Sequence, residues 1–403
     1  MVLNVTKRNG EIVPFESSKI VKAIGKATDA VGENLTDDQK TAIAVRIKNK
    51  ETETLAVEEI QDIVERLLME SGVYEVAKAY IRCRYERELA RKENTTDKTI
   101  QELLDGQNLY WNTENSNKDA QVNNVQRDYL AGIVSTDTAR RILLPKEIVE
   151  AHDKGLIHIH DLDYFSQKMT NCGLLNLEDM LMNGTSINGV FIDPQKKLLT
   201  ASTVASQICA AVSGMQYGGQ TITLSHLAPF VRMSWNIHRK DAIEDAQEIL
   251  GKEELSTEEL KEAEKVAYKR LKKEIKDSVQ TFNYQLNSLA SSNGQAAFLS
   301  VAMYIDEDPE YEEETAMLIE EFLHQRIKGM KNDVGVYVTQ AFPKLLYFLD
   351  ENNVYPDSKY YWLTQLAAKT TAKRMNPDYI SVKKMKEWKI NKFGNGDAYG
   401  CIN

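Results

Sequence analysis

The sequence predicts a mixed α/β protein in which a small N-terminal module precedes a larger region of strands and helices. Two observations support this fold class. Residues 2–15 read as two short strands around Asn9-Gly10, a dipeptide typical of tight hairpin turns. Farther along, apolar runs such as 298–304 follow long segments with helical spacing. With 403 residues, the chain is long enough for two or three domains.

Four helices are expected after the hairpin. The second begins after Thr36, because Gln39 three residues later completes a capping box. The third spans about 57–69 and ends near Gly72, and the polar stretch 91–98 suits a linker. Apolar residues with helical spacing mark the buried faces of the first and fourth helices: Ile20, Ala23, Ile24 and Ala27, then Val76, Ala79, Tyr80 and Cys83.

Cations gather around this hairpin. Lys7 and Arg8 flank the turn and Lys19 opens the first helix, so the three side chains together suit a phosphate group. On the residues alone, the favoured alternative is that exposed lysines on a hairpin are simply solvated charges. The chain has no GxxxxGK[ST] loop, which agrees with nucleotide binding without hydrolysis.

The segment 156–182 holds the chain's densest group of chemically reactive side chains. After a helix over 146–154, residues 156–160 alternate like a short strand, and Gly173 begins a leucine-rich segment with helical spacing. These patterns place Cys172 where a helix starts, and the positive potential there favours a thiolate. A lone cysteine is also common as a small buried hydrophobic residue, and both interpretations stay open.

Metal binding is not indicated. His158 and His160 would share one face of a strand near Asp163, but two histidines and one carboxylate are a weak zinc signal. Neither a disulfide framework nor a zinc module is expected, because the cysteines form no CxxC pair: Cys83, Cys172, Cys209 and Cys401.

Composition excludes several classes of function. A net charge of -10 and a pI near 5.4 argue against an electrostatic grip on nucleic acid. The N-terminus lacks the apolar core of a signal peptide, and no apolar run approaches the ~18 residues of a membrane helix. We therefore expect a cytoplasmic protein with reduced cysteines and neither a membrane nor a nucleic-acid partner.

Three later stretches carry weaker signals. Residues 200–212 read as a buried helix of small residues in which Cys209 packs. Gly218 and Gly219 either let the backbone approach a ligand closely or form a tight turn. Residues 240–276 are rich in Glu and Lys at helical spacing, which is typical of a solvated pair of helices.

Several strings in the chain resemble one family, the anaerobic (class III) ribonucleoside-triphosphate reductases, over about residues 3–401. In the N-terminal module, Val5-x-Lys7-Arg8-Asn9-Gly10 with Lys19-Ile20 is similar to an ATP-cone, which senses the ratio of ATP to dATP. The strings in the larger region are Gly155-Leu-Ile-His-Ile-His-Asp-Leu-Asp, Asn171-Cys172, Leu177-Glu-Asp-Met-Leu, Asn293-Gly294-Gln295 and Phe342-Pro-Lys-Leu.

The resemblance implies a fold and a function. An ATP-cone would occupy residues 1–92, as a β-hairpin plus four helices. Residues 93–403 would form the first part of a ten-stranded α/β barrel of the glycyl radical and ribonucleotide reductase type, with a charged helical elaboration at about 240–276. The implied activity is reduction of ribonucleoside triphosphates to deoxyribonucleoside triphosphates by thiyl and glycyl radical chemistry, under allosteric control by ATP and dATP.

The resemblance also implies roles for individual residues. Cys172 and Cys401 match the two active-site cysteines, with Cys401 at the radical position. A cysteine near a chain end without any role is the alternative for Cys401. Substrate binding falls on Asn171, Asn293, Gly294 and Gln295. Binding of ATP or dATP falls on Val5, Lys7, Arg8, Asn9, Gly10, Lys19 and Ile20.

The resemblance stops after Cys401. The family's remaining barrel strands, zinc-binding cysteines and C-terminal glycyl radical loop have no counterpart in the sequence. The expectation is an N-terminal fragment that is inactive without the missing half, whether from an intein, a split gene or a truncated frame. Formate as reductant, a radical SAM activase and a homodimer are implied by the family alone. The alternatives are a non-catalytic nucleotide-sensing fragment and, less consistent with these strings, a cobalamin-type reductase.

Overall fold

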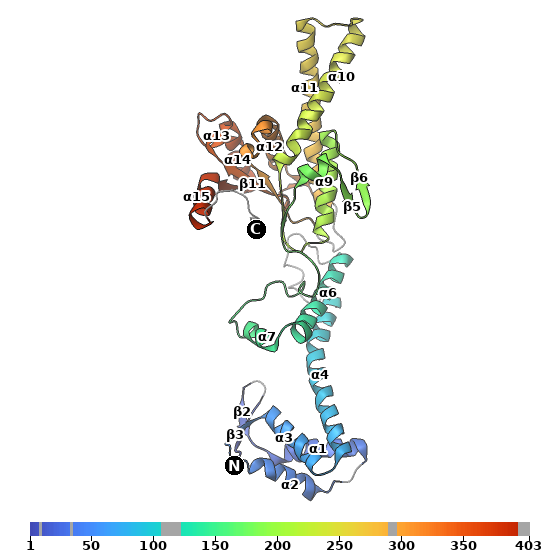
Figure 1. The fold of residues 1–403 in the computed structure, drawn as a ribbon, viewed down its shortest axis with the longest axis vertical. Coiled ribbons are helices and arrows are strands. Elements are labelled where there is room, and N and C mark those ends of the chain that lie inside the picture. The colour runs from blue at the N-terminus through green and yellow to red at the C-terminus, as the bar shows by residue number, and fades with distance from the viewer. Residues whose placement is uncertain (8–9, 33–34, 106–121, 289–295, 394–403) are drawn as a thin grey trace. The chain divides into compact units, whose positions relative to one another are not determined.

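The computed structural model describes residues 1–7, 10–32, 35–105, 122–288 and 296–393. The chain divides into two compact units, Met1–Gln101 and Glu102–Asn403 (Figure 1). Each unit has its own hydrophobic core, as the sequence patterns suggest. No helix among the described residues has the length and apolar character needed to cross a membrane.

The first unit begins with the predicted hairpin. Strands β1 (Asn4–Thr6) and β2 (Ile12–Pro14) pair antiparallel, and β3 (Thr54–Ala56) adds a parallel strand beside β1 that the sequence did not indicate. A three-residue strand is too short to leave a readable alternation of apolar and polar residues. Its identity as a strand comes from its pairing with β1.

Four helices complete this unit: α1 (Ser17–Val31), α2 (Asp37–Lys48), α3 (Val57–Glu70) and α4 (Tyr74–Leu104). The capping box of Thr36 and Gln39 is confirmed. The linker expected at 91–98 is wrong as a break in structure, because α4 continues through it. Its Arg, Lys and Glu residues are good helix formers. Arg84 on α4 pairs with Asp62 and Glu65 on α3 at 2.6 and 2.8 Å.

The second unit starts with helices. These are α6 (Asn123–Thr138), a π-helical turn (Ala139–Leu143) and α7 (Lys146–Asp153), the last as expected after Pro145. The strand predicted at 156–160 is wrong, since these residues form an irregular segment with no strand partner among the described residues. Alternation alone does not make a strand where no neighbouring strand is available to pair with it.

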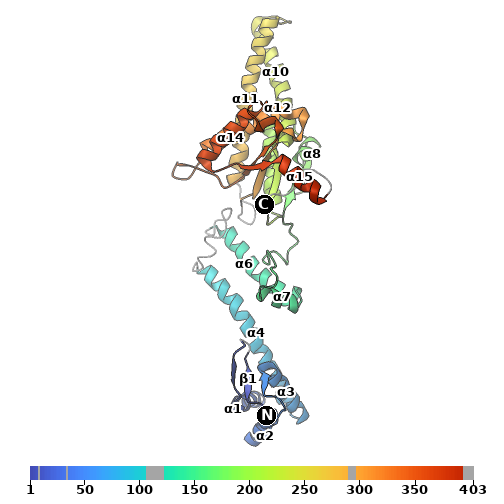
Figure 2. The same ribbon diagram turned by 90° about the vertical axis from the view of Figure 1, so that its left-hand side faces the viewer.

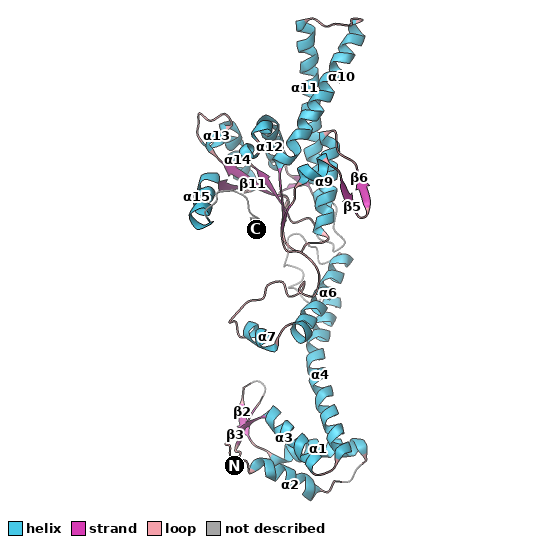
Figure 3. Ribbon diagram, viewed as in Figure 1, coloured by secondary structure: helices cyan, strands magenta, loops and turns pink. Residues whose placement is uncertain are grey.

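A five-stranded parallel sheet is the centre of the second unit (Figure 3). Its order is β12-β11-β8-β7-β4. Within this sheet, each strand therefore pairs with the sheet's next strand in sequence order. The apolar run 298–304 forms β8, and the Phe342-Pro-Lys-Leu string leads into β11. The bounds are β4 (Gly173–Leu174), β7 (Gln220–Thr223), β8 (Leu299–Met303), β11 (Lys344–Leu349) and β12 (Asp378–Ser381).

Helices connect the strands, and most of them pack on one face of this sheet, whereas the last helix packs its first residue on the other face. The main ones are α8 (Leu177–Met182), α9 (Leu198–Ser213), α10 (Ala228–Leu250), α11 (Thr257–Ser288), α12 (Glu312–Lys328), α14 (Tyr361–Arg374) and α15 (Val382–Phe393). The predicted charged helical pair is confirmed as α10 and α11, which extend side by side away from the sheet (Figure 1 and Figure 2).

Shorter elements join these helices and strands. They are the hairpins β5 (Thr185–Ile187) with β6 (Val190–Ile192) and β9 (Met330–Lys331) with β10 (Tyr337–Val338), the 3-10 turns Leu224–Leu227, Ile305–Glu307 and Pro309–Tyr311, and α13 (Glu351–Val354).

The two faces of the sheet differ. Alternate residues Leu299, Val301 and Met303 of β8 pack into the main core with α9, α10, α11, α12 and α14. The residues between them face the other way, where Ala302 belongs to a small cluster with Leu346, Phe348 and Val382 of α15. Period-two alternation therefore assigns every strand residue to a helix-covered face or to an opposite face. We call the second one the open face.

Glu274 of α11 binds the N-terminal end of α9, where the N-cap residue forms no capping hydrogen bond through its side chain. Its Oε1 accepts hydrogen bonds from the Leu199 amide at 3.1 Å and the Ser234 hydroxyl at 3.0 Å, and its Oε2 lies 2.6 Å from His238 Nε2. The carboxylate thereby satisfies an amide that a helix leaves unpaired. The network joins α9, α10 and α11 behind the sheet.

We expect Glu274→Ala to destabilise the second unit by about 1–3 kcal/mol, because it leaves the Leu199 amide and the Ser234 hydroxyl without their acceptor. Urea unfolding followed by circular dichroism measures the change. Glu264→Ala is the control, since it removes only a half-exposed ion pair with Arg239 and is expected to cost less than about 1 kcal/mol. Equal losses in the two variants would contradict this role for Glu274.

Candidate functional site

Cys172 lies immediately before β4, at the edge of the parallel sheet. The expectation that it marks a helix start is wrong. Gly173 begins a strand, and helix α8 starts only at Leu177, with Asn176 as its cap. The leucine spacing at 174, 177 and 181 fits a helix, but backbone pairing with β7 takes the first of these residues into the sheet. The location of Cys172 therefore follows from strand pairing.

The chain around Cys172 runs parallel to residues 216–221. The Gly218 amide donates to the Asn171 carbonyl at 2.9 Å, the Tyr217 amide to the Thr170 carbonyl at 3.2 Å, and the Gly173 amide to the Gly219 carbonyl at 3.2 Å. A Cβ on Gly218 would lie 2.5 Å from the Asn171 carbonyl oxygen, inside contact distance. Gly218 thus allows the backbone to approach Asn171 closely.

The Cys172 thiol is half-buried and lies 3.2 Å from Asn171 Oδ1, to which it can donate a hydrogen bond. Cys209 differs in every respect. It is fully buried in α9, and burial raises the pKa of its thiol to about 12, so it stays protonated at neutral pH. Its predicted packing role is confirmed, and Cys172 is more accessible than this buried thiol. Cys83 is half-buried in α4.

Two aromatic residues stand beside Cys172. The ring of Tyr217 stacks on that of Tyr164, with centroids 4.8 Å apart and planes within 7°. Burial raises the pKa of the Tyr217 phenol, and Asp161, Cys172 and Asp163 raise it further, so the phenol remains protonated at neutral pH. Neither tyrosine was predicted as a site residue. The glycine pair after Tyr217 is the sequence signal that marks it.

Strand register places Cys172 on the open face of the sheet. Leu174 pairs with Thr221, and Thr221 with Ser300, so these side chains form one row across three strands. Ser300 shares its face with Ala302, two residues on, which lies on the open face. Cys172 precedes Leu174 by two residues and therefore points to the same side. The Thr221 hydroxyl is buried and has no hydrogen-bond partner within the described part of the chain.

A second polar cluster follows the C-terminal ends of β7 and β8. Glu307 accepts hydrogen bonds from Thr223 and, at 2.6 Å, from Ser225. Burial lowers the pKa of the neighbouring His226, which the Glu307 and Glu178 carboxylates only partly offset. Glu307 and the two hydroxyls satisfy one another, whereas the buried Nδ1 of His226 has no hydrogen-bond partner among the described residues. The cluster lies at the opposite strand ends from Cys172, and we assign the Glu307 hydrogen bonds a structural role.

The histidines predicted as weak metal ligands lie in the irregular segment after α7. His158 Nε2 is 3.3 Å from His160 Nδ1, and His160 is 3.5 Å from Asp161. No group of three or more His, Cys, Asp or Glu side chains able to hold a metal occurs in the described ranges. The other predicted site residues of this unit, Asn293, Gly294, Gln295 and Cys401, lie outside the described residues.

The predicted ATP or dATP residues lie along the hairpin and at the start of α1. Val5 packs against the core of the unit, and Ile20 is buried in it. Lys7 forms an exposed ion pair with Glu11, and Lys19 with Glu16, both at 2.9 Å. Gly10 has a φ of +83°, which fits its place in the predicted turn. Arg8 and Asn9 lie outside the described residues.

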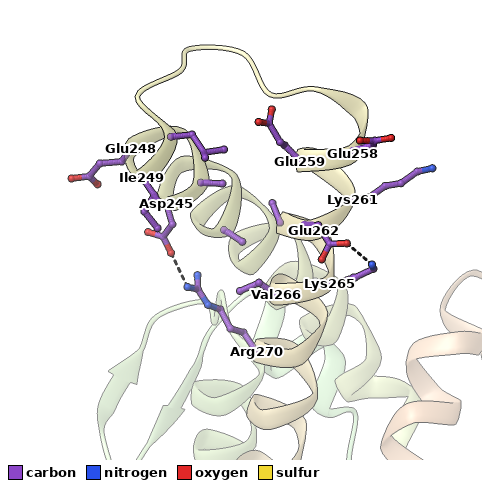
Figure 4. Close-up of a pocket in the computed structure, with 14 residues that line it drawn as sticks. Asp245, Glu248, Ile249, Glu258, Glu259, Lys261, Glu262, Lys265, Val266 and Arg270 are labelled. Carbon is purple, nitrogen blue, oxygen red and sulfur yellow. Dashed lines mark hydrogen bonds and ion pairs between the residues drawn. The ribbon is translucent and has the colours of Figure 1, made fainter.

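A cavity of about 820 Å³ lies between the far ends of α10 and α11 (Figure 4). Its walls are alanines, Ile249 and Val266, and its rim carries charges such as the Asp245–Arg270 ion pair at 2.7 Å. Its lining contains no thiol, imidazole or hydroxyl group. The chemistry of the lining therefore gives no reason to place a reaction there.

We expect Gly218→Ala to push Asn171 and Cys172 away from β7, because the added methyl group would overlap the Asn171 carbonyl. The unfolding free energy of the second unit should fall by about 1–3 kcal/mol, as in other overpacked sites. Urea unfolding and the rate of Cys172 alkylation measure the two effects. Gly25→Ala in α1 is the control, since its Cβ meets nothing within 4 Å. Unchanged stability and alkylation in Gly218→Ala would contradict the close approach.

Known proteins similar to this chain come from several bacteria. The anaerobic ribonucleoside-triphosphate reductase of Haemophilus influenzae is 35% identical over 390 residues, which are 94% of this chain and 52% of that protein. That of Escherichia coli is 36% identical over 387 residues, with the same two shares. The chain thus spans about half the length of the curated relatives it matches.

A solved structure of the anaerobic ribonucleotide reductase from Thermotoga maritima, in complex with dATP and CTP, aligns with a TM-score of 0.42 and 16% identity. The alignment covers 64% of this chain and 41% of that one. The family model of the ATP cone domain matches residues 3–89. The model described as anaerobic ribonucleoside-triphosphate reductase matches residues 114–401. Because that match covers well over half of the sequence, the chain belongs to the anaerobic ribonucleoside-triphosphate reductase family.

Proposed function

We propose that this chain supplies the nucleotide-sensing cone and the Cys172-bearing part of the barrel of a reductase that converts ribonucleoside triphosphates to deoxyribonucleoside triphosphates. One observation carries the proposal within this structure. A half-exposed thiol lies at a strand edge on the open face of a parallel sheet, and a close glycine contact fixes its backbone. Family membership supplies the reaction, and the geometry supplies a residue able to take part in it.

In the proposed reaction, a thiyl radical at Cys401 takes the hydrogen from C3′ of the ribose. The 2′-hydroxyl then leaves as water after it is protonated, and the Cys172 thiol donates a hydrogen atom to the sugar. Formate then gives a hydrogen atom to the Cys172 thiyl radical and its remaining electron to the 3′-keto sugar, and leaves as carbon dioxide. The Cys401 thiol returns a hydrogen atom to C3′, which completes the deoxyribose and regenerates the Cys401 thiyl radical. Asn171, 3.2 Å from the sulfur of Cys172, orients the thiol. Asn293, Gly294 and Gln295 are proposed as further substrate contacts.

The cone is proposed to bind ATP and dATP through Val5, Lys7, Arg8, Asn9, Gly10, Lys19 and Ile20. Exposed ion pairs such as Lys7–Glu11 and Lys19–Glu16 contribute little stability, about 0–1 kcal/mol each. A triphosphate offers the same ammonium groups several charges at once, so it competes effectively with a single carboxylate. The two lysines are therefore available as phosphate ligands despite their local partners.

We propose two domains with separate roles. The cone at 1–92 senses nucleotides, and the partial barrel at 93–403 carries the catalytic residues. The described sheet ends at two edge strands, β4 and β12, and Cys172 lies at one of them. We propose that the half of the relatives beyond this match closes the barrel and brings the glycyl radical and the zinc site. A homodimer, a radical SAM activase and a cytoplasmic location complete the proposal.

A second candidate is a nucleotide-sensing fragment without catalysis. Two observations favour it: the cone forms a compact unit with its own core, and the matched region covers about half of each curated relative. Such a fragment would bind ATP or dATP and act on a separate reductase. Loss of turnover on changing Cys172 distinguishes the two candidates.

We expect Cys172→Ala, in the chain combined with the remaining half of a relative, to abolish deoxyribonucleotide formation, because the proposed reaction takes a hydrogen atom from the Cys172 thiol. Anaerobic turnover with formate and CTP measures this. Cys209→Ala is the control, since its buried thiol has only a packing role and turnover should remain. Formation of dCTP at the normal rate by Cys172→Ala would refute the proposed reaction.

We also expect the chain to bind ATP and dATP, and Lys7→Gln combined with Lys19→Gln to weaken binding at least tenfold through loss of charge-assisted hydrogen bonds. Isothermal titration calorimetry measures the affinity. Lys78→Gln is the matched control, because Lys78 is an exposed lysine in a similar local ion pair on α4. Calorimetry without heat from either nucleotide would remove the cone assignment.

A further inference from the structure

The row of side chains next to Cys172 continues one strand beyond Ser300. Lys344, the first residue of β11, pairs with Ser300 in register. The complete row is therefore Leu174, Thr221, Ser300 and Lys344 across four parallel strands. With about 4.8 Å between neighbouring strands, Lys344 begins roughly 14 Å from Leu174.

Lys344 points to the open face. Leu345 and Tyr347 of the same strand belong to the helix-covered core, whereas Leu346 and Phe348 belong to the cluster on the other side. Alternation puts Lys344 with the second pair, on the face that carries Cys172. Its side chain is exposed, and no carboxylate in the described ranges forms an ion pair with it.

The backbone before Lys344 is firmly held. Arg326, only 4% exposed, donates to the carbonyls of Gln340 at 2.8 Å and Pro343 at 2.5 Å, and Asn287 donates to the Phe342 carbonyl at 3.0 Å. Because the Arg326 guanidinium binds carbonyl groups, it fixes the backbone before Lys344 and leaves the positive charge of Lys344 in place. The ammonium of Lys344 thus starts from a rigid base.

The row combines three kinds of group. The Cys172 thiol lies two residues before Leu174 at one end, and the Thr221 and Ser300 hydroxyls are buried in the middle. Lys344, which forms no ion pair among the described residues, lies at the other end. Thr221 is only 7% exposed, and its hydroxyl has no hydrogen-bond partner among the described residues. A ligand with a sugar at one end and an anion at the other matches this order of groups.

We propose that Lys344 binds the phosphate chain of the nucleotide whose ribose lies over Cys172, with the Thr221 and Ser300 hydroxyls between them. This inference rests on the proposed function and adds the residue that positions the anionic end of the substrate. Lys344 acts as a positioning residue, because its ammonium lies far from the reacting carbons. An ammonium held on one side of the thiol fixes the direction in which the nucleotide lies along the row.

The test uses the full chain and needs no turnover. Protection of Cys172 from iodoacetamide, read by peptide mass spectrometry, is measured against CTP and against cytidine. The expected result is that CTP protects the wild-type chain at lower concentration than cytidine. Lys344→Gln should raise the half-protecting CTP concentration about tenfold or more and leave that of cytidine unchanged, because only the phosphates lose a charge-assisted hydrogen bond.

Two controls separate the possible causes. Lys373→Gln on α14 removes the same charge from an exposed lysine outside the sheet and should behave as wild type. Lys344→Arg should retain most of the CTP protection, since the cation is kept. Thermal unfolding shows whether Lys344→Gln remains folded, as expected for an exposed side chain.

The outcomes distinguish this inference from the proposed function. If CTP protects Cys172 equally well in wild type and Lys344→Gln, the inference is overturned and the proposed function stands. If neither CTP nor cytidine protects Cys172 in the wild-type chain, both are overturned. Protection that depends on the phosphates and on Lys344 supports both.

Discussion

The contact between Gly218 and Asn171 is the constraint on which the site depends. β4 contains only two residues, too few to hold its place by strand pairing alone. The amide of Gly218 reaches the Asn171 carbonyl at 2.9 Å only because no side chain stands between the two backbones. This contact extends the pairing one step before the strand and brings Cys172 onto the sheet. The thiol therefore belongs to a rigid edge even though its own strand is short.

The two faces of the sheet separate stability from chemistry. One face contacts five helices and carries the large buried side chains, including Phe230, Phe282 and Phe322. The network around Glu274 ties three of these helices together behind the sheet. The open face instead presents hydroxyls, a thiol and a lysine at its N-terminal end. Because the main core forms on one side, the other side carries only a small apolar cluster around Ala302, Leu346 and Phe348 and has room for polar groups.

The cone obtains its stability in a different way. Its core is made of short aliphatic side chains from four helices, and its three-residue strands contribute little packing of their own. Lys7 of the hairpin and Lys19 of α1 remain outside that core in local ion pairs. Binding of an anionic ligand there would exchange weak surface pairs for stronger ones without disturbing the packing. This arrangement suits a module that responds to nucleotide concentration.

The sequence alone determined the elements with strong local signals. The hairpin, the Thr36 capping box, the packing of Cys209 and the helices α9, α10 and α11 all follow from nearest-neighbour chemistry. Resemblance of short strings was sufficient for the family. Strands without a local signal were missed, as with β3, and alternation at 156–160 predicted a strand that has no partner.

Only the tertiary structure decided what surrounds Cys172. Sequence spacing placed it at a helix start, but pairing between residues 170–175 and 216–221, more than 40 positions apart, makes it a strand edge. The stack of Tyr217 on Tyr164 and the row from Leu174 to Lys344 depend on register between strands. Register is a property of two strands together. The alternation within one strand shows which of its residues share a face, but it does not show which residues of another strand pair with them. A pattern within one segment cannot contain it.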